Sequence, residues 1–308
     1  MKSNGTISFH EILNTLKNDK LRNELEQLSS HHVRSLYWLL FSPCPIKQGG
    51  VEGVSLFPED WIEALKLSSK LYFEKLDQDP DPLILFLSKG NTYRLGMYAE
   101  RLLCFFFDTF SETELLLHNF QIIDQKKTLG EVDFIIKWNN RSIHIELATK
   151  YYLAVNSTDD FHKWVGPSGN DSLERKIKKV RNLQLPITDS EIFKSQTGLD
   201  SVESFLFLRG CFFTHKSFEP SWKNPNANYC HYLYLDEFLI DYNKDSNRYF
   251  FLWKPNWMSS LIGVVSDLNT NRATTLDLSK LIKKEGHVLV LDLQAKVPFF
   301  IVRSDWPN

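Results

Sequence analysis

Two acidic residues occupy matching places in neighbouring segments that alternate apolar and polar residues. Asp133 lies in the first segment, Glu146 lies in the second, and Asn139-Asn140 separates them. Asparagine tolerates the left-handed backbone of a two-residue hairpin turn, so Trp138 should face Arg141 and Asp133 should oppose Glu146. Opposed carboxylates destabilise a strand pair unless a cation compensates, and Mg²⁺ prefers carboxylates completed by water and phosphate. The spacing therefore predicts a divalent-metal site.

A lysine and a third acid accompany this pair. Strand alternation places Lys150 on the same face as Glu146 and Ala148. An ammonium beside a metal and a phosphate can orient the attacking water or stabilise the charge that develops during metal-assisted hydrolysis. Upstream, Glu100 borders an apolar helical face, and we expect it to support the metal site.

Basic residues follow the acidic pair in one short predicted helix. Such a run is either a solvated helix face or a surface that tracks nucleic-acid phosphates, and both interpretations stay open. Lys176 is also a second candidate for the ammonium beside the pair, and Gln184 either reaches the site or serves as a packing amide. The nucleic-acid candidates are Arg175, Lys176, Lys178, Lys179, Arg181 and Gln184.

Two further polar residues share the strand face of the pair. Glu131, expected opposite Ala148, is either a third ligand or a solvated neighbour of the turn. His144, expected opposite Ile135, either binds metal or phosphate or is a hydrogen-bonded structural histidine.

The elements that position these residues follow from the same patterns. A helix over 93–110 leads to an extended segment at 119–123 and to the hairpin strands at 132–138 and 142–152. A helix then begins at Asp171, the predicted N-cap, with Glu174 as its capping-box partner. Further strands are predicted at 205–213, 231–235, 249–253, 287–293 and 299–302.

Composition limits the function classes. Of 308 residues, 43% are hydrophobic and the net charge is −2, so we expect a substantial core and any polyanion site to be local. Four separated cysteines form no zinc or disulfide pattern, and no apolar segment is long enough to cross a bilayer. A cytoplasmic protein without a membrane partner is expected. Nucleotide-binding loops, serine-hydrolase elbows and zinc-protease helices are absent from the sequence.

The helix acid, the hairpin Asp and Glu and the nearby Lys together resemble the PD-(D/E)XK nuclease superfamily. The resemblance implies that Asp133 and Glu146 bind metal, that Lys150 assists water and that Glu100 completes the site as a further metal ligand. The usual motif has Lys two residues after Glu, whereas this chain has Ala148 there. Segments 94–100, 129–134, 146–153, 164–167 and 184–186 more narrowly resemble a bacterial family of proteins of unknown function.

This resemblance implies an α/β (α+β) fold, in which helices flank a mixed sheet. We expect a helical N-terminal region at 1–82, bounded by an Asp- and Pro-rich stretch, a nuclease-like core at 83–190 and an α+β C-terminal extension at 191–308.

The implied activity is Mg²⁺- or Mn²⁺-dependent hydrolysis of nucleic-acid phosphodiester bonds, with DNA ahead of RNA as partner and no oligomeric state predicted. One alternative is an inactive nuclease-like module that binds nucleic acid or a protein. Another is a purely structural core, with the function in the C-terminal half.

Overall fold

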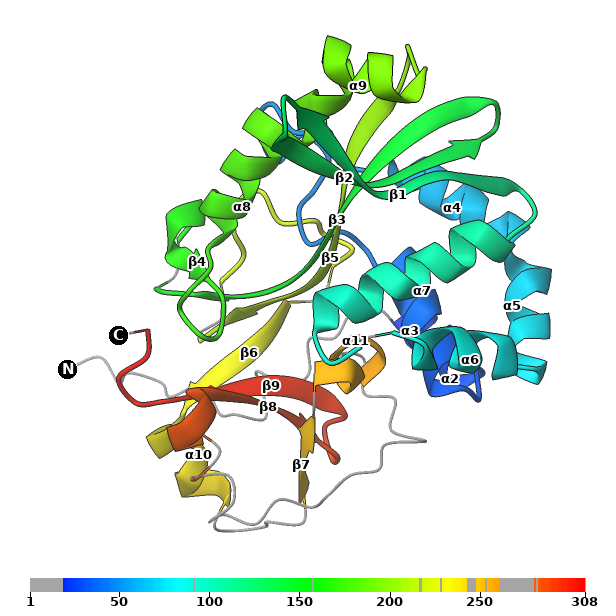
Figure 1. Cartoon of the computed structure of the whole chain (residues 1–308). Helices are drawn as coiled ribbons and strands as arrows, with labels where there is room; N and C mark the ends of the chain where they lie inside the picture. Colours follow the sequence, from blue (N-terminus) through cyan, green and yellow to red (C-terminus); the bar gives the residue numbers. More distant parts are fainter. Residues whose placement is uncertain are drawn as a thin grey trace.

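One mixed sheet organises the protein, and helices cover both of its faces (Figure 1). The computed structural model describes residues 19–90, 92–156, 158–215, 218–227, 229–242, 248–252, 254–260, 280 and 282–307. The first eighteen positions of the predicted helical region, and position 253 of the strand predicted at 249–253, lie outside these residues. The fold is therefore mixed α/β, as the sequence predicts.

Helices form the N-terminal part of the described chain, as expected. Asp79-Pro80, from the Asp- and Pro-rich stretch, separates α5 (Lys70–Gln78) from α6 (Asp81–Ser88), and helical structure continues past residue 82. The next helix, α7 (Leu95–Thr109), confirms the helix predicted at 93–110 and packs against β1 and β3. The preceding helices are α2 (Asp19–Glu26), α3 (His31–Phe41), α4 (Glu59–Ser68), α5 (Lys70–Gln78) and α6 (Asp81–Ser88).

Two consecutive hairpins form one side of the sheet. They join β1 (Thr113–Asp124), β2 (Lys127–Trp138) and β3 (Arg141–Ala154). Asn139 and Asn140 have φ values of 49° and 60°, the left-handed geometry of the predicted turn. Trp138 pairs with Arg141, which confirms the predicted register of β2 and β3.

A long crossover links β3 to the parallel strand β5 (Glu203–Thr214). Its main helix is α8 (Leu173–Lys179), whose N-cap is Ser172, with its side chain accepting the Arg175 N–H. The prediction of Asp171 as the cap was wrong by one residue, because the Asp171 carboxylate binds other groups. The crossover also contains η1 (Phe161–Lys163), β4 (Trp164–Val165), the π-helix η2 (Val180–Gln184), η3 (Leu185–Asp189) and α9 (Glu191–Thr197).

The C-terminal strands continue the same sheet, in the order β1-β2-β3-β5-β6-β9-β8-β7 with β4 paired to β3. Because β5 pairs with β3, the boundary expected at residue 190 does not interrupt the sheet. None of the helices in the described part of the chain has the length and apolar character that a membrane crossing requires. The elements after β5 are β6 (Tyr229–Tyr234), α10 (Leu235–Tyr242), β7 (Tyr249–Leu252), η5 (Lys254–Asn256), α11 (Trp257–Ser260), β8 (His287–Asp292) and β9 (Val297–Val302).

The two faces of β3 pack against different helices. Ile145 and Tyr151 belong to the apolar cluster that includes α7. Ala148 and Tyr152 belong to a second cluster, together with Ile177 of α8. Since side chains alternate along a strand, Glu146 and Lys150 point toward the α8 face with Ala148.

Close approach between β3 and β5 requires a glycine beside Lys150. Gly210 has a φ of 139°, and a Cβ there would lie 1.7 Å from the Lys150 carbonyl oxygen. Any larger residue would force the two central strands apart.

Candidate functional site

The acidic pair lies where β2 and β3 stop pairing. Their ladder runs from Trp138–Arg141 to Phe134–Ile145 and ends one step before Asp133 and Glu146. At that point Asp133 Oδ2 accepts a hydrogen bond from the Leu147 N–H, at 2.9 Å. The hairpin of β1 and β2 extends past this point (Figure 1). The predicted pair therefore lies at the end of the ladder, on the α8 face.

Glu146 is held by side chains from the crossover. It is 1% exposed, and its Oε1 accepts hydrogen bonds from Lys176 Nζ at 2.8 Å and from Gln184 Nε2 at 2.5 Å. Lys176 also donates to Gln184 Oε1 at 3.2 Å. The other carboxylate oxygen, Oε2, is buried and has no hydrogen-bond partner among the described residues. A buried acceptor without a partner is costly, so Oε2 is the atom of the site that would gain most from binding a cation or a hydrogen-bond donor.

A π-helical turn brings the two crossover donors together. Eight positions separate Lys176 from Gln184, and in a regular α-helix they would lie about 80° apart around the axis. The wider turn of η2 ends at Gln184. Each residue of a π-helix turns through a smaller angle about the axis than a residue of an α-helix, so Gln184 lies closer to Lys176 around the axis. Lys176 and Gln184 therefore reach the same oxygen of Glu146.

Asp133 titrates close to neutral pH. Burial, followed by the charge of Glu146, raises the pKa of its carboxyl from 3.8 to about 7. The hydrogen bond from the Leu147 N–H and the charge of Lys176 oppose this rise, and the charge of Glu100 adds to it. One ammonium does not compensate the pair fully, so a further cation would favour the charged form of Asp133.

Lys150 lies on the predicted face but binds elsewhere. Its ammonium donates to Asp171 Oδ2 at 2.6 Å, and the Tyr152 hydroxyl donates to the same oxygen at 3.1 Å. Burial alone would raise the pKa of Asp171, but these hydrogen bonds hold it below its usual value. Lys176, the second candidate, is therefore the lysine that contacts the acidic pair.

Glu100 stands beside the pair with partners of its own. Its carboxylate accepts a 2.6 Å hydrogen bond from Asn119, and its Oε1 lies 3.3 Å from His118 Nε2 without hydrogen-bond alignment. Contacts with Cys104 and then Glu100 raise the pKa of His118 to about 9. The sequence prediction missed both partners, because His118 and Asn119 come from β1, where only an extended segment was expected.

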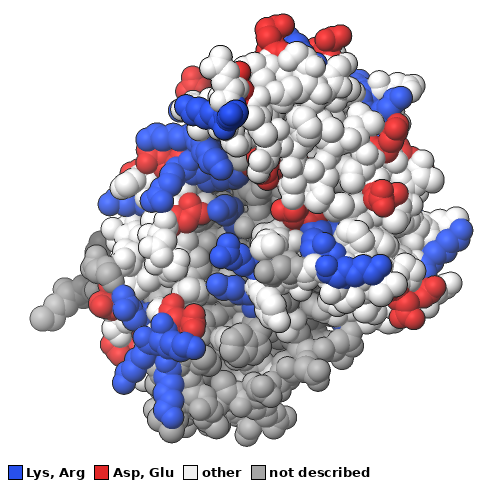
Figure 2. All heavy atoms as spheres, in the orientation of Figure 1, with Lys and Arg blue, Asp and Glu red and all other residues white. Residues whose placement is uncertain are grey.

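The basic residues of the crossover divide between the site and the surface. Lys176 and Gln184 face inward, whereas Lys178 and Lys179 are exposed. Lys178 pairs with Glu174 at 2.8 Å, Arg175 donates to the Asn170 carbonyl at 2.9 Å, and Arg181 lies over Gly53. Figure 2 shows Lys and Arg side chains gathered over α8 on this side of the molecule.

The two remaining candidates lie outside the site. His144 is fully buried, its Nδ1 lies 3.2 Å from Ser204 Oγ, and burial lowers its pKa to about 4, which identifies a neutral structural histidine. Glu131 is exposed on β2 and accepts a hydrogen bond from Gln121 of β1. It does not oppose Ala148, because the ladder between β2 and β3 ends before it.

The chemistry of the acidic pair fits a divalent cation. Within the described residues, no group of three or more His, Cys, Asp or Glu side chains is arranged to hold a metal ion. The pair itself offers a buried oxygen of Glu146 without a partner and a carboxyl, that of Asp133, whose charge is disfavoured. Mg²⁺ commonly binds through one or two carboxylates and takes its other ligands from water and phosphate.

Comparison with known proteins gives one match. A family model described as a domain of unknown function, DUF1853, matches residues 34–298. The match includes every candidate residue named above. No curated protein and no solved structure matches the chain.

Proposed function

The chain belongs to the DUF1853 family, and we propose that it is a metal-dependent nuclease that hydrolyses phosphodiester bonds of nucleic acid. The observation that carries this proposal is the acidic pair at the end of the β2–β3 ladder. Glu146 is buried and held on one oxygen by Lys176 and Gln184, and its other oxygen has no partner among the described residues. The carboxyl of the neighbouring Asp133 has a pKa raised to about 7.

The surrounding fold supports a core of the PD-(D/E)XK kind. An acid-bearing helix, α7, precedes a hairpin that carries the Asp and the Glu. A crossover containing α8 then returns the chain to a strand parallel to β3. The helix and the hairpin are the elements that the resemblance implies, and the charges of Glu146 and Glu100 both act on Asp133.

Each residue has a separate role in the proposed reaction. Asp133 and Glu146 would hold Mg²⁺ or Mn²⁺, which supplies Lewis-acid activation of the phosphoryl group. Lys176 would stabilise the negative charge that develops on the phosphate oxygens, a role that the sequence first suggested for Lys150. Gln184 fixes the orientation of Glu146, and Glu100 keeps the region acidic. The exposed Lys178 and Lys179 would contact backbone phosphates, with DNA ahead of RNA as substrate.

A cleavage assay tests the proposal directly. Single- and double-stranded DNA and RNA are incubated with the protein in Mg²⁺ or Mn²⁺, and Asp133→Asn, Glu146→Gln and Lys176→Met are compared with the wild type. Each variant should lose about a hundredfold or more in rate, since each removes a charged group of the site. Glu131→Gln is the matched control because it removes an exposed carboxylate from the same strand. Cleavage by the wild type that persists in Glu146→Gln would refute the assignment.

One observation favours a second candidate, a nuclease-like module that binds nucleic acid without cleaving it. Lys176 already neutralises part of the charge of Glu146, and position 148 carries Ala instead of the usual Lys. A module of this kind would retard DNA in a salt-dependent gel-shift assay, and no substrate would be cleaved in either metal. Calorimetric titration with Mn²⁺ separates both candidates from a purely structural core, which would show no binding that depends on Asp133.

A further inference from the structure

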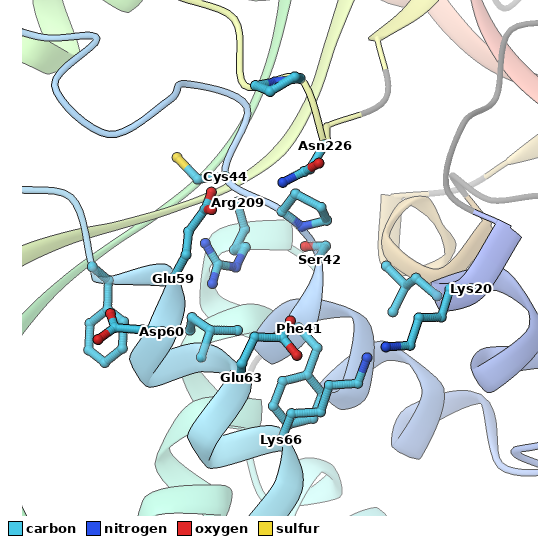
Figure 3. Close-up of a pocket in the computed structure, with 15 residues that line it drawn as sticks. Lys20, Phe41, Ser42, Cys44, Glu59, Asp60, Glu63, Lys66, Arg209 and Asn226 are labelled. Atoms are coloured by element: carbon cyan, nitrogen blue, oxygen red, sulfur yellow. The ribbon is translucent and has the colours of Figure 1, made fainter.

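A cavity lies away from the acidic pair, where the end of α3, the start of α4 and β5 meet (Figure 3). Its volume is about 550 Å³, within the range of small-molecule sites. None of Asp133, Glu146, Lys176 and Gln184 lines it. Any ligand of this cavity is therefore distinct from the proposed nucleic-acid substrate.

A buried arginine lines the inner end of the cavity. Arg209 is 3% exposed, and three of its N–H groups donate to backbone carbonyls: Nε to Leu39, Nη2 to Leu40 and Nη1 to Leu208. A guanidinium has five N–H groups, so one on Nη1 and one on Nη2 are left over. Burial lowers the pKa of Arg209, and the negative charge of Glu59, another residue of the lining, opposes this effect. The two remaining N–H groups match the two oxygens of a carboxylate.

A second polar group lies beside this arginine. Ser42 is 4% exposed, and its hydroxyl has no hydrogen-bond partner among the described residues. In Figure 3, the Glu59 carboxylate and Ser42 lie on either side of the guanidinium of Arg209. The Ser42 hydroxyl and the two remaining N–H groups of Arg209 are donors from which an anion would accept hydrogen bonds.

The remaining lining combines acidic, basic and apolar residues. Glu59, Asp60 and Glu63 of α4 line the cavity, and Glu59 and Glu63 are one helical turn apart. Three basic residues, Arg209, Lys20 and Lys66, balance these three charges. Phe41 and Phe57 contribute aromatic surface, as do other apolar residues. A lining that carries both signs of charge and is neutral overall disfavours a bare anion such as phosphate, because the acids would repel it.

We propose that this cavity binds a small zwitterion with an apolar body, of the α-amino-acid class. The ligand carboxylate pairs with Arg209 and Ser42, and its ammonium group faces Glu63, one helical turn further along α4. Its side chain packs between Phe41 and Phe57.

Calorimetry with three matched probes tests this proposal on the full-length protein. L-phenylalanine carries both charges, 3-phenylpropanoate lacks the ammonium group, and phenethylamine lacks the carboxylate. L-phenylalanine should bind, and each truncated probe should bind at least about tenfold more weakly, since each leaves one charged wall unpaired. Absence of L-phenylalanine binding, or equal binding of 3-phenylpropanoate, would overturn the proposal.

Variants assign the two ends of the ligand. Ser42→Ala should weaken L-phenylalanine binding about five- to tenfold, and Glu63→Gln should weaken it about fivefold while leaving 3-phenylpropanoate unaffected. Both changes are small, and the unfolding temperature checks that each variant is folded. Glu112→Gln, an exposed carboxylate outside the cavity, is the control and should bind as the wild type does. Unchanged binding in Ser42→Ala and Glu63→Gln would overturn the assignment of the site, whatever the variants do to DNA cleavage.

Discussion

Replacement of Asp133 by asparagine should stabilise the protein at alkaline pH while abolishing metal binding. The folded protein raises the pKa of this carboxyl from 3.8 to about 7 through burial and the neighbouring Glu146. At about 1.4 kcal/mol for each pH unit, ionised Asp133 costs the folded state about 4 kcal/mol. Asparagine avoids that cost and can still accept the Leu147 N–H, but its amide group needs a new partner. We therefore expect a net gain of about 2–3 kcal/mol in the free energy of unfolding.

The sign of the pH dependence follows from the raised pKa. Between about pH 4 and about pH 7 the folded protein holds a proton on Asp133 that the unfolded chain has lost. The stability that this proton contributes is present at low pH and is lost as the pH rises through about 7. The advantage of Asp133→Asn should consequently be largest above pH 7 and should disappear as the pH falls toward about 4.

Urea unfolding at about pH 8 and at about pH 5 measures this difference without reference to activity. Glu131→Gln is the control because it removes an exposed carboxylate from the same strand, and it should follow the wild type at both values. Added Mn²⁺ should stabilise the wild type but not Asp133→Asn. If Asp133→Asn is less stable than the wild type at about pH 8, Lys176 already compensates the acidic pair, and the argument for a missing cation fails.

Three further predictions follow from the same geometry. Lys176→Met should lower the cleavage rate about a hundredfold, because the charge that stabilises the phosphate oxygens is lost. The same change should tighten Mn²⁺ binding several-fold in calorimetry, because it removes a positive charge beside the metal. Weaker Mn²⁺ binding would count against the role of Lys176. At Mn²⁺ concentrations too low to saturate the protein, cleavage by the wild type should rise with pH through about 7, as the metal-free form loses the Asp133 proton, and a pH–rate profile that is flat across neutrality would contradict the raised pKa. Gly210→Ala should lower the free energy of unfolding, measured in urea, by more than about 3 kcal/mol, because its Cβ would meet the Lys150 carbonyl. Gly96→Ala is the control: its Cβ would lie in open space, so stability should change by no more than about 1 kcal/mol.

Local sequence patterns predict the hairpin of β2 and β3 and the helix α7. Alternation and the Asn139-Asn140 turn determine the register of the hairpin, and the helix at α7 follows from apolar spacing. The pairing of β3 with β5 is not visible in the sequence, because 48 residues of crossover separate the end of β3 from the start of β5. For the same reason the sequence does not show that residues beyond 190 complete the central sheet. The partners of Glu100 depend on how β1 packs against α7, which is likewise a tertiary contact.

The position of the lysine shows why sequence spacing alone assigns the wrong donor. Counting along β3 selects Lys150, but Asp171 at the start of α8 binds that ammonium, so it does not reach Glu146. Ala148, where the usual motif has Lys, is 3% exposed and belongs to the same apolar cluster as Ile177 of α8. A lysine at 148 would occupy the space that α8 fills, whereas alanine allows α8 to pack close to β3. That close packing lets Lys176 supply from the helix the charge that the strand lacks.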